Sequence, residues 1–300
     1  MFLSFIVCVF SWKGKVMINI IDAIINLLNN PIIKLNQEYV NDRNRANNMG
    51  EALEEYVKDL FAGTIDLKDP SARLERFEKE FSYSGNQNNP PDFMIKNGDA
   101  VEVKKIESPN SSLALNSSYP KHKLYSSSPM ITKACRECEN WDVKDIIYAV
   151  GIVGSDKKSL SSLAFVYGED YAASQEVYEK IRNTIKNGVT TIPDVEFEET
   201  KELGRVNRVD PLGITYLRIR GMWGIENPFK VFDYVFTRDF DCDFNFMAII
   251  NEKKWNSLNR TEELRKLIRE TAGANLLKTV IKNPDNPVKL RNAYVITYKK

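Results

Sequence analysis

The stretch PPDFMIKNGDAVEVKKIES, residues 90–108 of this 300-residue chain, decides how the fold is interpreted. Apolar runs on both sides of an Asn-Gly pair indicate two antiparallel strands joined by a tight turn. Glu102 and Lys104 are two residues apart in the second strand, so their side chains share one face. The pair is either part of a solvated strand face or part of a site whose third member is Asp92.

The length of the turn determines whether Asp92 can reach that pair. A two-residue loop would place Asp92 opposite Val103, on the wrong face. A three-residue loop over residues 96–98, ending in a left-handed Gly98 at a bulge, would place Asp92 opposite Glu102. Residues paired in this way have Cβ atoms about 5 Å apart, close enough to share one ion. We predict the three-residue loop, because glycine suits the bulged position.

Two carboxylates and a lysine match what phosphodiester hydrolysis requires. Mg²⁺ prefers one or two carboxylates together with waters and substrate oxygens. A lysine beside the metal can orient or deprotonate the attacking water and stabilise charge. The acid-x-Lys pattern alone is unspecific and recurs, for example, at residues 66–68 and 252–254. Only the hairpin also has a Pro-Asp at hairpin distance and an apolar strand around the acid, and spacing alone leaves both interpretations open.

The composition restricts the class of protein. A hydrophobic content of 43% and a charged content of 28% favour a large globular core and argue against global disorder. The net charge of +1 gives no overall basic field, so nucleic acid would have to meet a local patch. Cys135 and Cys138 form a C-x-x-C pair without a second ligand pair, and His122 is the only histidine. We interpret the cysteines as ordinary helix residues in a reducing compartment, with a redox or metal role as the alternative.

The N-terminal segment is apolar but short. Its first ten residues fall well below the roughly 20 that span a bilayer, and no basic region precedes them. A helical pattern begins just after Met17. We interpret residues 1–16 as a non-native or loosely packed extension, with a signal-like or membrane-touching segment as the alternative. Residues 17–300 are expected to form a single domain in a cytoplasmic protein with no membrane partner.

Hydrophobic periodicity predicts both helices and strands along the chain. Helices are expected at residues 18–28, 50–62, 131–141, 172–187 and 261–281. Further strands are expected at residues 145–155, 161–171, 214–220, 244–250 and 293–298. Helices packed beside a mixed sheet give an α/β (α+β) fold.

Longer segments give a more specific indication. The residues P91-D92 and E102-V-K104 resemble the PD-(D/E)xK nuclease signature. The segments NRANNMGEALEEYVKDLF, SLALNSSYPKHKL, ETKELGRVNRVDP and ITYLRIRGMWGIENP resemble the NgoPII-type type II restriction endonucleases, and the similarity extends from Met17 to about residue 255. The resemblance implies a restriction-endonuclease-like core and Mg²⁺-dependent cleavage of double-stranded DNA at the palindrome GGCC.

The resemblance also implies roles for particular residues. Asp92 and Glu102 would be metal ligands, and Lys104 would be the base that positions the water. The superfamily often carries a further glutamate on the helix before the hairpin, four residues after a glycine. Glu54 has this spacing from Gly50 and is therefore a third candidate ligand, with a solvated helix face as the alternative.

Two segments are candidates for holding DNA, because phosphates and guanine edges favour Lys, Arg, Asn and Ser side chains. The first directly follows the catalytic strand and contains Asn116, Ser117, Ser118, Lys121 and Lys123. The second contains Arg205, Arg208, Arg218 and Arg220. An ordinary surface loop and surface salt bridges, respectively, are the alternatives.

The expected function is site-specific cleavage of double-stranded DNA within a restriction-modification system. A palindromic target favours a two-fold homodimer in which each subunit cuts one strand. A companion DNA methyltransferase, encoded nearby but not bound, is implied by the resemblance. The alternatives are a structure-specific PD-(D/E)xK nuclease of repair or recombination and a non-catalytic DNA-binding protein.

Overall fold

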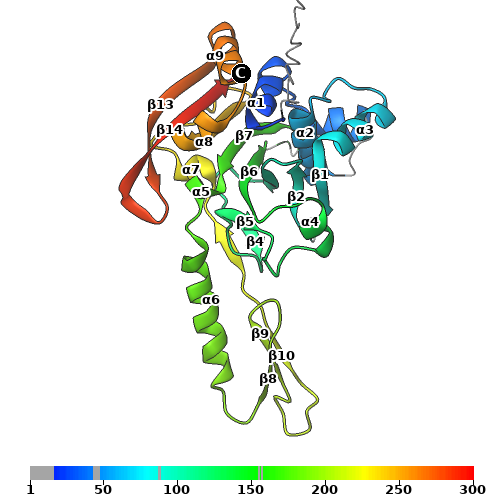
Figure 1. Ribbon diagram of the computed structural model, residues 1–300, viewed down its shortest axis with the longest axis vertical. Helices are drawn as coiled ribbons and strands as arrows, with labels where there is room; N and C mark the ends of the chain where they lie inside the picture. The colour runs from blue at the N-terminus through cyan, green and yellow to red at the C-terminus, as the bar shows by residue number, and fades with distance from the viewer. Residues whose placement is uncertain (1–16, 43–47, 87–88, 155, 157) are drawn as a thin grey trace, which may run out of the picture.

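The computed structural model describes residues 17–42, 48–86, 89–154, 156 and 158–300. Residues 1–16, which we interpret from the sequence as a non-native or loosely packed extension, lie outside this part of the chain. The described chain has a body built around one large sheet and an arm that projects from the body (Figure 1). Within the described residues, no helix has both the length and the apolar character needed to cross a membrane.

The helices, in chain order, are α1 (Ile20–Asn29), the π-helix η1 (Asn36–Asp42), α2 (Met49–Ala62), α3 (Pro70–Glu80), α4 (Lys133–Glu137), α5 (Gly168–Tyr171), α6 (Gln175–Thr190), α7 (Pro228–Val231), α8 (Glu252–Ser257) and α9 (Thr261–Glu270). The strands of the body are β1 (Phe81–Asn86), β2 (Asn89–Ile95), β3 (Ala100–Ile106), β4 (Leu113–Asn116), β5 (Lys123–Tyr125), β6 (Val143–Val153), β7 (Leu160–Tyr167), β11 (Trp223–Ile225), β12 (Asn245–Asn251), β13 (Ala274–Asn283) and β14 (Asn286–Lys299). The arm contains β8 (Glu196–Glu198), β9 (Gly204–Asn207) and β10 (Leu217–Ile219).

The large sheet has the order β1-β2-β3-β6-β7-β12-β14-β13, with β5 paired to β6 outside this path. Strand β3 runs parallel to β6, and β7 runs parallel to β12, while the other neighbours along the path are antiparallel. A mixed sheet with helices on both faces confirms the predicted α/β class and is consistent with a restriction-endonuclease-like fold.

The two faces of the sheet carry separate cores. One core joins α1, α2 and α9 to apolar residues such as Val101 and Ile147. The other joins α5 and α7 to residues such as Ala100, Ile146 and Tyr148. Because neighbouring strand residues alternate between faces, this division fixes the direction of every side chain on β3.

The predicted helix over residues 50–62 is confirmed as α2, and its ends follow from local sequence. The side chain of Asn48 accepts hydrogen bonds from the backbone N–H groups of Gly50 and Glu51 at the start of the helix. Gly63 ends it in the left-handed conformation, with φ of 67°. Its buried stripe, which includes Leu53 and Phe61, packs on the β3 side of the sheet.

The three-residue loop of the β2–β3 hairpin is confirmed, but its geometry differs from the prediction. The N–H of Ile95 donates to the carbonyl of Asp99, and the N–H of Gly98 donates to the carbonyl of Ile95, both at 2.9 Å. The left-handed residue is Asn97, with φ of 56°, and Gly98 does not have positive φ. The expectation of a left-handed Gly98 was therefore wrong, because Asn tolerates this conformation at the third position of the turn.

Other differences arise where a local pattern suits two structures. Residues 271–281 were expected to continue the last helix, but α9 ends at Glu270 and the chain turns at Gly273, with φ of 80°, into strand β13. The β-branched residues that follow suit a strand better than a helix. Helix α3 was not predicted, although Asp69 caps it and Pro70 occupies its first position. Only residues 133–137 of the helix expected at 131–141 are helical.

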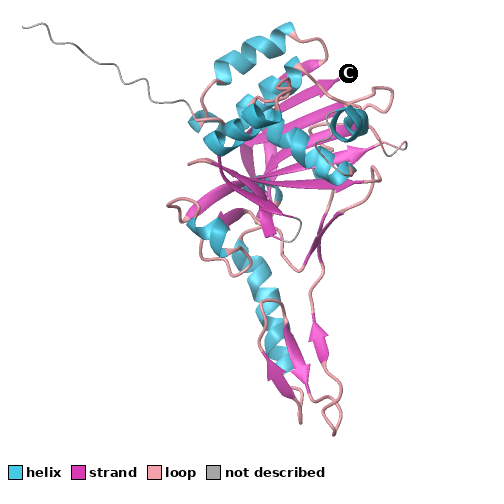
Figure 2. Ribbon diagram, turned by 90° about the vertical axis from the view of Figure 1, so that its right-hand side faces the viewer, coloured by secondary structure: helices cyan, strands magenta, loops and turns pink. Residues whose placement is uncertain are grey.

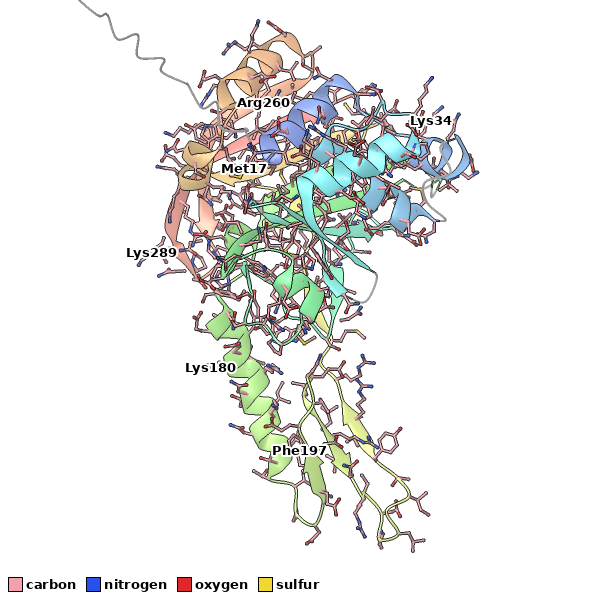
Figure 3. The ribbon with its side chains drawn as sticks, turned by 45° about the vertical axis from the view of Figure 1, so that its right-hand side comes forward. Met17, Lys34, Lys180, Phe197, Arg260 and Lys289 are labelled. Atoms are coloured by element: carbon pink, nitrogen blue, oxygen red, sulfur yellow. The ribbon has the colours of Figure 1, made fainter. Side chains whose placement is uncertain are left out.

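The arm consists of α6 beside a three-stranded sheet of order β10-β9-β8 (Figure 2). Figure 3 shows Lys180 on the helix and Phe197 on β8 in this extension. The guanidinium of Arg182 on α6 donates to the carbonyl of Lys201 at 2.9 Å, which ties helix and sheet together. The amphipathic pattern correctly predicted a helix, but α6 has no buried residue. The strand expected at 214–220 is reduced to the three residues of β10 at the edge of this small sheet.

The aromatic core beneath β2 supports the strand that carries Asp92. Phe93 is fully buried, with ring centroids 4.7 Å from Phe81 and 5.6 Å from Phe61. We predict that Phe93→Ala lowers the free energy of unfolding by about 3–5 kcal/mol, because it leaves a cavity between these rings. Chemical denaturation measures the change. Leu74→Ala on the exposed side of α3 is the control and should stay within about 0.5 kcal/mol. Equal losses in the two variants would contradict this account of the core.

Candidate active site

A cavity of about 300 Å³ opens where β2, β3 and the loop after β4 meet. The predicted catalytic residues Asp92, Glu102 and Lys104 all line it. The polar part of its wall also includes side chains from the end of β4, from the segment after it and from the base of the arm: Asn116, Ser117, Ser118, Tyr119, Lys121, Glu202 and Arg220. The cavity therefore brings together residues that are more than a hundred positions apart in the chain.

Asp92 lies near the end of the paired part of the hairpin. Phe93 pairs with Val101, and continuing this register places Asp92 opposite Glu102. Oδ2 of Asp92 accepts a hydrogen bond from the backbone N–H of Val103 at 2.6 Å, so the side chain is held against β3. Burial, followed by the nearby Glu102 carboxylate, raises the pKa of Asp92 well above its ordinary value.

Glu102 and Lys104 form a close ion pair on the same face of β3. The Lys104 ammonium lies 2.5 Å from Oε1 of Glu102, and both side chains are largely buried. Burial alone would lower the pKa of Lys104, but the Glu102 and Asp92 carboxylates outweigh it and raise the pKa above its ordinary value. Lys105 points the other way, is exposed, and pairs with Glu107 at 2.8 Å.

The donor set fits a hard divalent cation. Oε2 of Glu102 is buried and accepts no hydrogen bond from any described residue, so it has the lone pairs that a cation would use. The repulsion between Asp92 and Glu102 would be relieved by the same cation. Across the described ranges, no three His, Cys, Asp or Glu side chains already form a metal-binding group, so the two carboxylates are the candidate protein ligands.

Glu54 lies near the cavity but does not line it. Its carboxylate accepts a hydrogen bond from Lys58 at 2.7 Å, one turn further along α2. It still acts electrostatically on Asp92 and Lys104. Glu54 is thus close enough to act on the carboxylate pair, while one of its oxygens is bound to Lys58.

The predicted DNA-contacting residues divide into three groups. Asn116, Ser117, Ser118, Lys121 and Arg220 line the cavity beside the catalytic residues. Lys123 instead pairs with Asp145 at 2.6 Å and with Glu169 at 3.2 Å, away from that wall. The remaining arginines lie on the arm.

The arm arginines are held by local partners. The Arg205 guanidinium lies 3.9 Å from the centroid of the Tyr216 ring, and Arg208 lies 3.7 Å from Glu196. Arg218 and Arg205 are register partners on neighbouring strands and so share a face. The arm therefore presents guanidinium groups outward from a small sheet whose base reaches the cavity.

Glu202 is a site residue that the sequence reasoning did not select. Oε1 accepts hydrogen bonds from Ser117 at 2.8 Å and from Nε of Arg220 at 2.9 Å, and Oε2 lies 3.3 Å from Nη2 of Arg218. Burial opposes ionisation, but the hydrogen bond from Arg220 leads the contacts that lower the pKa of Glu202 below its ordinary value. The available signal was that four arginines accompany only two acids, Glu202 and Asp210, in residues 202–220.

The C-x-x-C pair lies at the C-terminal end of α4. Cys135 is fully buried, and this burial raises the pKa of its thiol to about 12. Cys138 donates from its sulfur to the carbonyl of Cys135 at 3.1 Å. A thiol that stays protonated at neutral pH is a poor nucleophile and a poor metal ligand, and Cys138 follows the last residue of α4 while Cys135 lies within it.

Comparison with known proteins places the chain in a family. The family model described as NgoPII restriction endonuclease matches residues 18–282. The chain is 58% identical over 280 residues to the type II restriction enzyme NgoPII of Neisseria gonorrhoeae, covering 93% of this chain and 99% of that protein. No solved structure matches the chain.

The repulsion between the carboxylates of Asp92 and Glu102 should lower the free energy of unfolding when no cation is present. A carboxyl whose pKa is raised on folding contributes stability that is present at low pH and lost as the pH rises toward the raised pKa. We predict that, in EDTA, Asp92→Asn raises the melting temperature, and that this gain grows between pH 5 and pH 8 to roughly 2–4 °C, or about 1 kcal/mol.

Thermal unfolding followed by circular dichroism measures this effect. Asp142→Asn, at an exposed position before β6, is the control and should leave the melting temperature unchanged at both pH values. A gain in Asp92→Asn that is the same at pH 5 and pH 8 would argue against repulsion between buried carboxylates.

Proposed function

The chain belongs to the NgoPII restriction endonuclease family and is a type II restriction endonuclease, and from this premise we propose that it cleaves double-stranded DNA at GGCC with Mg²⁺ bound by Asp92 and Glu102. The observation that supports the chemistry best is the convergence of these two carboxylates and Lys104 in one cavity. The GGCC target comes from the family resemblance. The restriction reaction itself is site-specific hydrolysis of DNA in a restriction-modification system.

The proposed chemistry assigns one task to each side chain. Asp92 and Glu102 would hold a divalent ion, which when bound would neutralise charge at the phosphate and make the attacking water more acidic. Lys104, held by Glu102 as an ammonium group, positions the attacking water and stabilises the negative charge that develops on it. Val103 donates its backbone N–H to Asp92 and so keeps that carboxylate turned toward the cavity. Glu54 is proposed as an additional ligand, released from Lys58 when the ion binds.

The proposed DNA surface continues from the cavity to the arm. Asn116, Ser117, Ser118 and Lys121 would meet the backbone next to the scissile phosphate, because they line the same cavity as the carboxylates. The other proposed contacts are Lys123, Arg205, Arg208, Arg218 and Arg220. Arginine forks suit guanine O6 and N7, which a GGCC reader must recognise in the major groove.

A palindromic target also suggests how the enzyme assembles. We propose a two-fold homodimer in which each subunit cuts one strand, since a protein two-fold axis can coincide with that of the DNA. The companion methyltransferase would be a separate protein that protects host GGCC sites. The enzyme is proposed to act in the cytoplasm, where the host chromosome and incoming DNA are both present.

Digestion of a sequenced plasmid tests the proposed activity and target. With Mg²⁺ we expect discrete fragments whose mapped ends all lie within GGCC, and we expect no cleavage in EDTA because oxygen ligands alone do little chemistry without the ion. Discrete ends at another sequence would refute the target but not the class of enzyme. Cleavage without discrete ends would favour a structure-specific nuclease.

Replacement of Lys104 tests the catalytic role. Lys104→Ala should lower the single-turnover cleavage rate by about 10²–10⁴-fold, the range for loss of a positioned acid or base. DNA binding with Ca²⁺ in place of Mg²⁺ should remain. Lys105→Ala is the matched control, because Lys105 points away from the cavity toward Glu107. Full activity in Lys104→Ala would remove this lysine from the mechanism.

A further inference from the structure

Lys121 differs from the other cations around the cavity because no described residue provides it with a carboxylate partner. Lys104 is bound to Glu102, and Arg220 is bound to Glu202. Lys121 lines the same cavity, yet it forms no ion pair with any carboxylate in the described part of the chain. A surface lysine would ordinarily extend to water or pair with an acid, so this ammonium group requires an explanation.

The position of Lys121 is fixed by two tyrosines. Its backbone N–H donates to the hydroxyl of Tyr148 at 2.7 Å, and Tyr148 is the register partner of Glu102 on the neighbouring parallel strand. Lys121 therefore lies over the face of the sheet that carries the catalytic residues. Its ammonium lies 3.5 Å from the centroid of the Tyr119 ring, a cation–π contact that supports the charge without neutralising it.

The surroundings of Lys121 destabilise the charged form of its side chain. Burial, followed by the positive charge of Arg182, lowers the pKa of Lys121 to about 8, and the carboxylates of Glu179 and Glu102 only partly oppose this. The facing charged groups are thus Arg182 and Glu179 on α6 and Glu102 on β3. A partly buried ammonium group without a carboxylate partner would be stabilised by binding an anion that does not belong to the chain.

We propose that Lys121 is a second catalytic lysine, whose ammonium contacts a non-bridging oxygen of the scissile phosphate and stabilises the negative charge that develops there. This inference rests on the proposed function of the site. It differs from a general DNA contact because Lys121 shares the cavity with Asp92 and Glu102, where the reacting phosphate must lie. Preorganised donors of this kind act most strongly in buried sites.

The reaction balances with water as the only co-reactant. The water oxygen forms a bond to phosphorus, and the bond between phosphorus and the leaving sugar oxygen breaks with its electron pair on that oxygen. One proton leaves the attacking water, and one proton is taken up by the leaving oxygen. Lys121 keeps its own proton throughout, and its contribution is electrostatic.

The test compares Lys121→Met and Lys121→Arg with the wild type on one GGCC duplex. In Lys121→Met the single-turnover rate with Mg²⁺ should fall about 10²–10³-fold, the typical loss for one donor to a developing oxyanion. The Kd measured with Ca²⁺ in place of Mg²⁺ should change less than about fivefold. Lys133→Met, on an exposed lysine of α4, is the matched control and should cleave normally.

The pH profile of kcat/KM separates a catalytic role from a structural one, because it reports groups of the free enzyme. The Lys121 ammonium is charged below pH 8 and neutral above it, so wild-type kcat/KM should decline above pH 8. Arginine remains charged throughout this range. Lys121→Arg should therefore retain activity and lose this decline between pH 8 and pH 10, even if Lys121→Met does not fold.

The outcomes distinguish this inference from the proposed function. If the wild type cleaves the duplex and Lys121→Met cleaves within about threefold of it, only the role of Lys121 is overturned. If the fall in cleavage rate of Lys121→Met is accompanied by an equal rise in its Kd, Lys121 is a binding residue and the inference is overturned. A pH profile of Lys121→Arg that is the same as that of the wild type would also overturn it. If the wild type fails to cleave any GGCC duplex, the proposed function itself falls.

Discussion

The register of the β2–β3 hairpin is the constraint on which the site depends. The period of a strand is two residues, so a loop shorter or longer by one residue would turn Asp92 to the opposite face from Glu102. The hydrogen bonds of Ile95 with Asp99 and with Gly98 fix the three-residue loop, and the two cores on either side of the sheet fix which face each residue occupies. The carboxylate pair is therefore a consequence of turn length and of apolar alternation together.

Much of this could be predicted from sequence because the hairpin is local. The pairing of Asp92 with Glu102 follows from spacing within about ten residues, and the caps of α2 follow from Asn48 and Gly63. The turn itself was only partly predictable, because both Asn and Gly accept positive φ and the structure places it at Asn97. Prediction was least reliable at residues 271–281, where one apolar pattern fits both a helix and the observed strand β13.

The rest of the site depends on contacts that no short pattern contains. Glu202 is 100 residues from Glu102 in sequence, yet it lines the same cavity and binds Ser117 from the segment after β4. Its ion pairs with Arg218 and Arg220 also reduce the positive charge that residues 202–220 present to a ligand, because Glu202 partly neutralises these arginines. Any DNA phosphate or base that takes up these guanidinium groups must compete with a carboxylate that is already largely buried, which favours ligands that match the geometry closely.

Packed aromatic side chains connect the arm to the wall of the cavity. Tyr178 on α6 stacks on Tyr119 with centroids 5.5 Å apart, and the edge of Trp223 meets Tyr178 at 5.7 Å. The ring of Tyr119 in turn makes the cation–π contact with the ammonium of Lys121. A displacement of α6 must therefore either break this aromatic stack or move the cavity wall with it, because close-packed rings do not deform gradually. If the proposed DNA contacts of the arm and the proposed phosphate site of the cavity are correct, this packed group of rings would link recognition to hydrolysis.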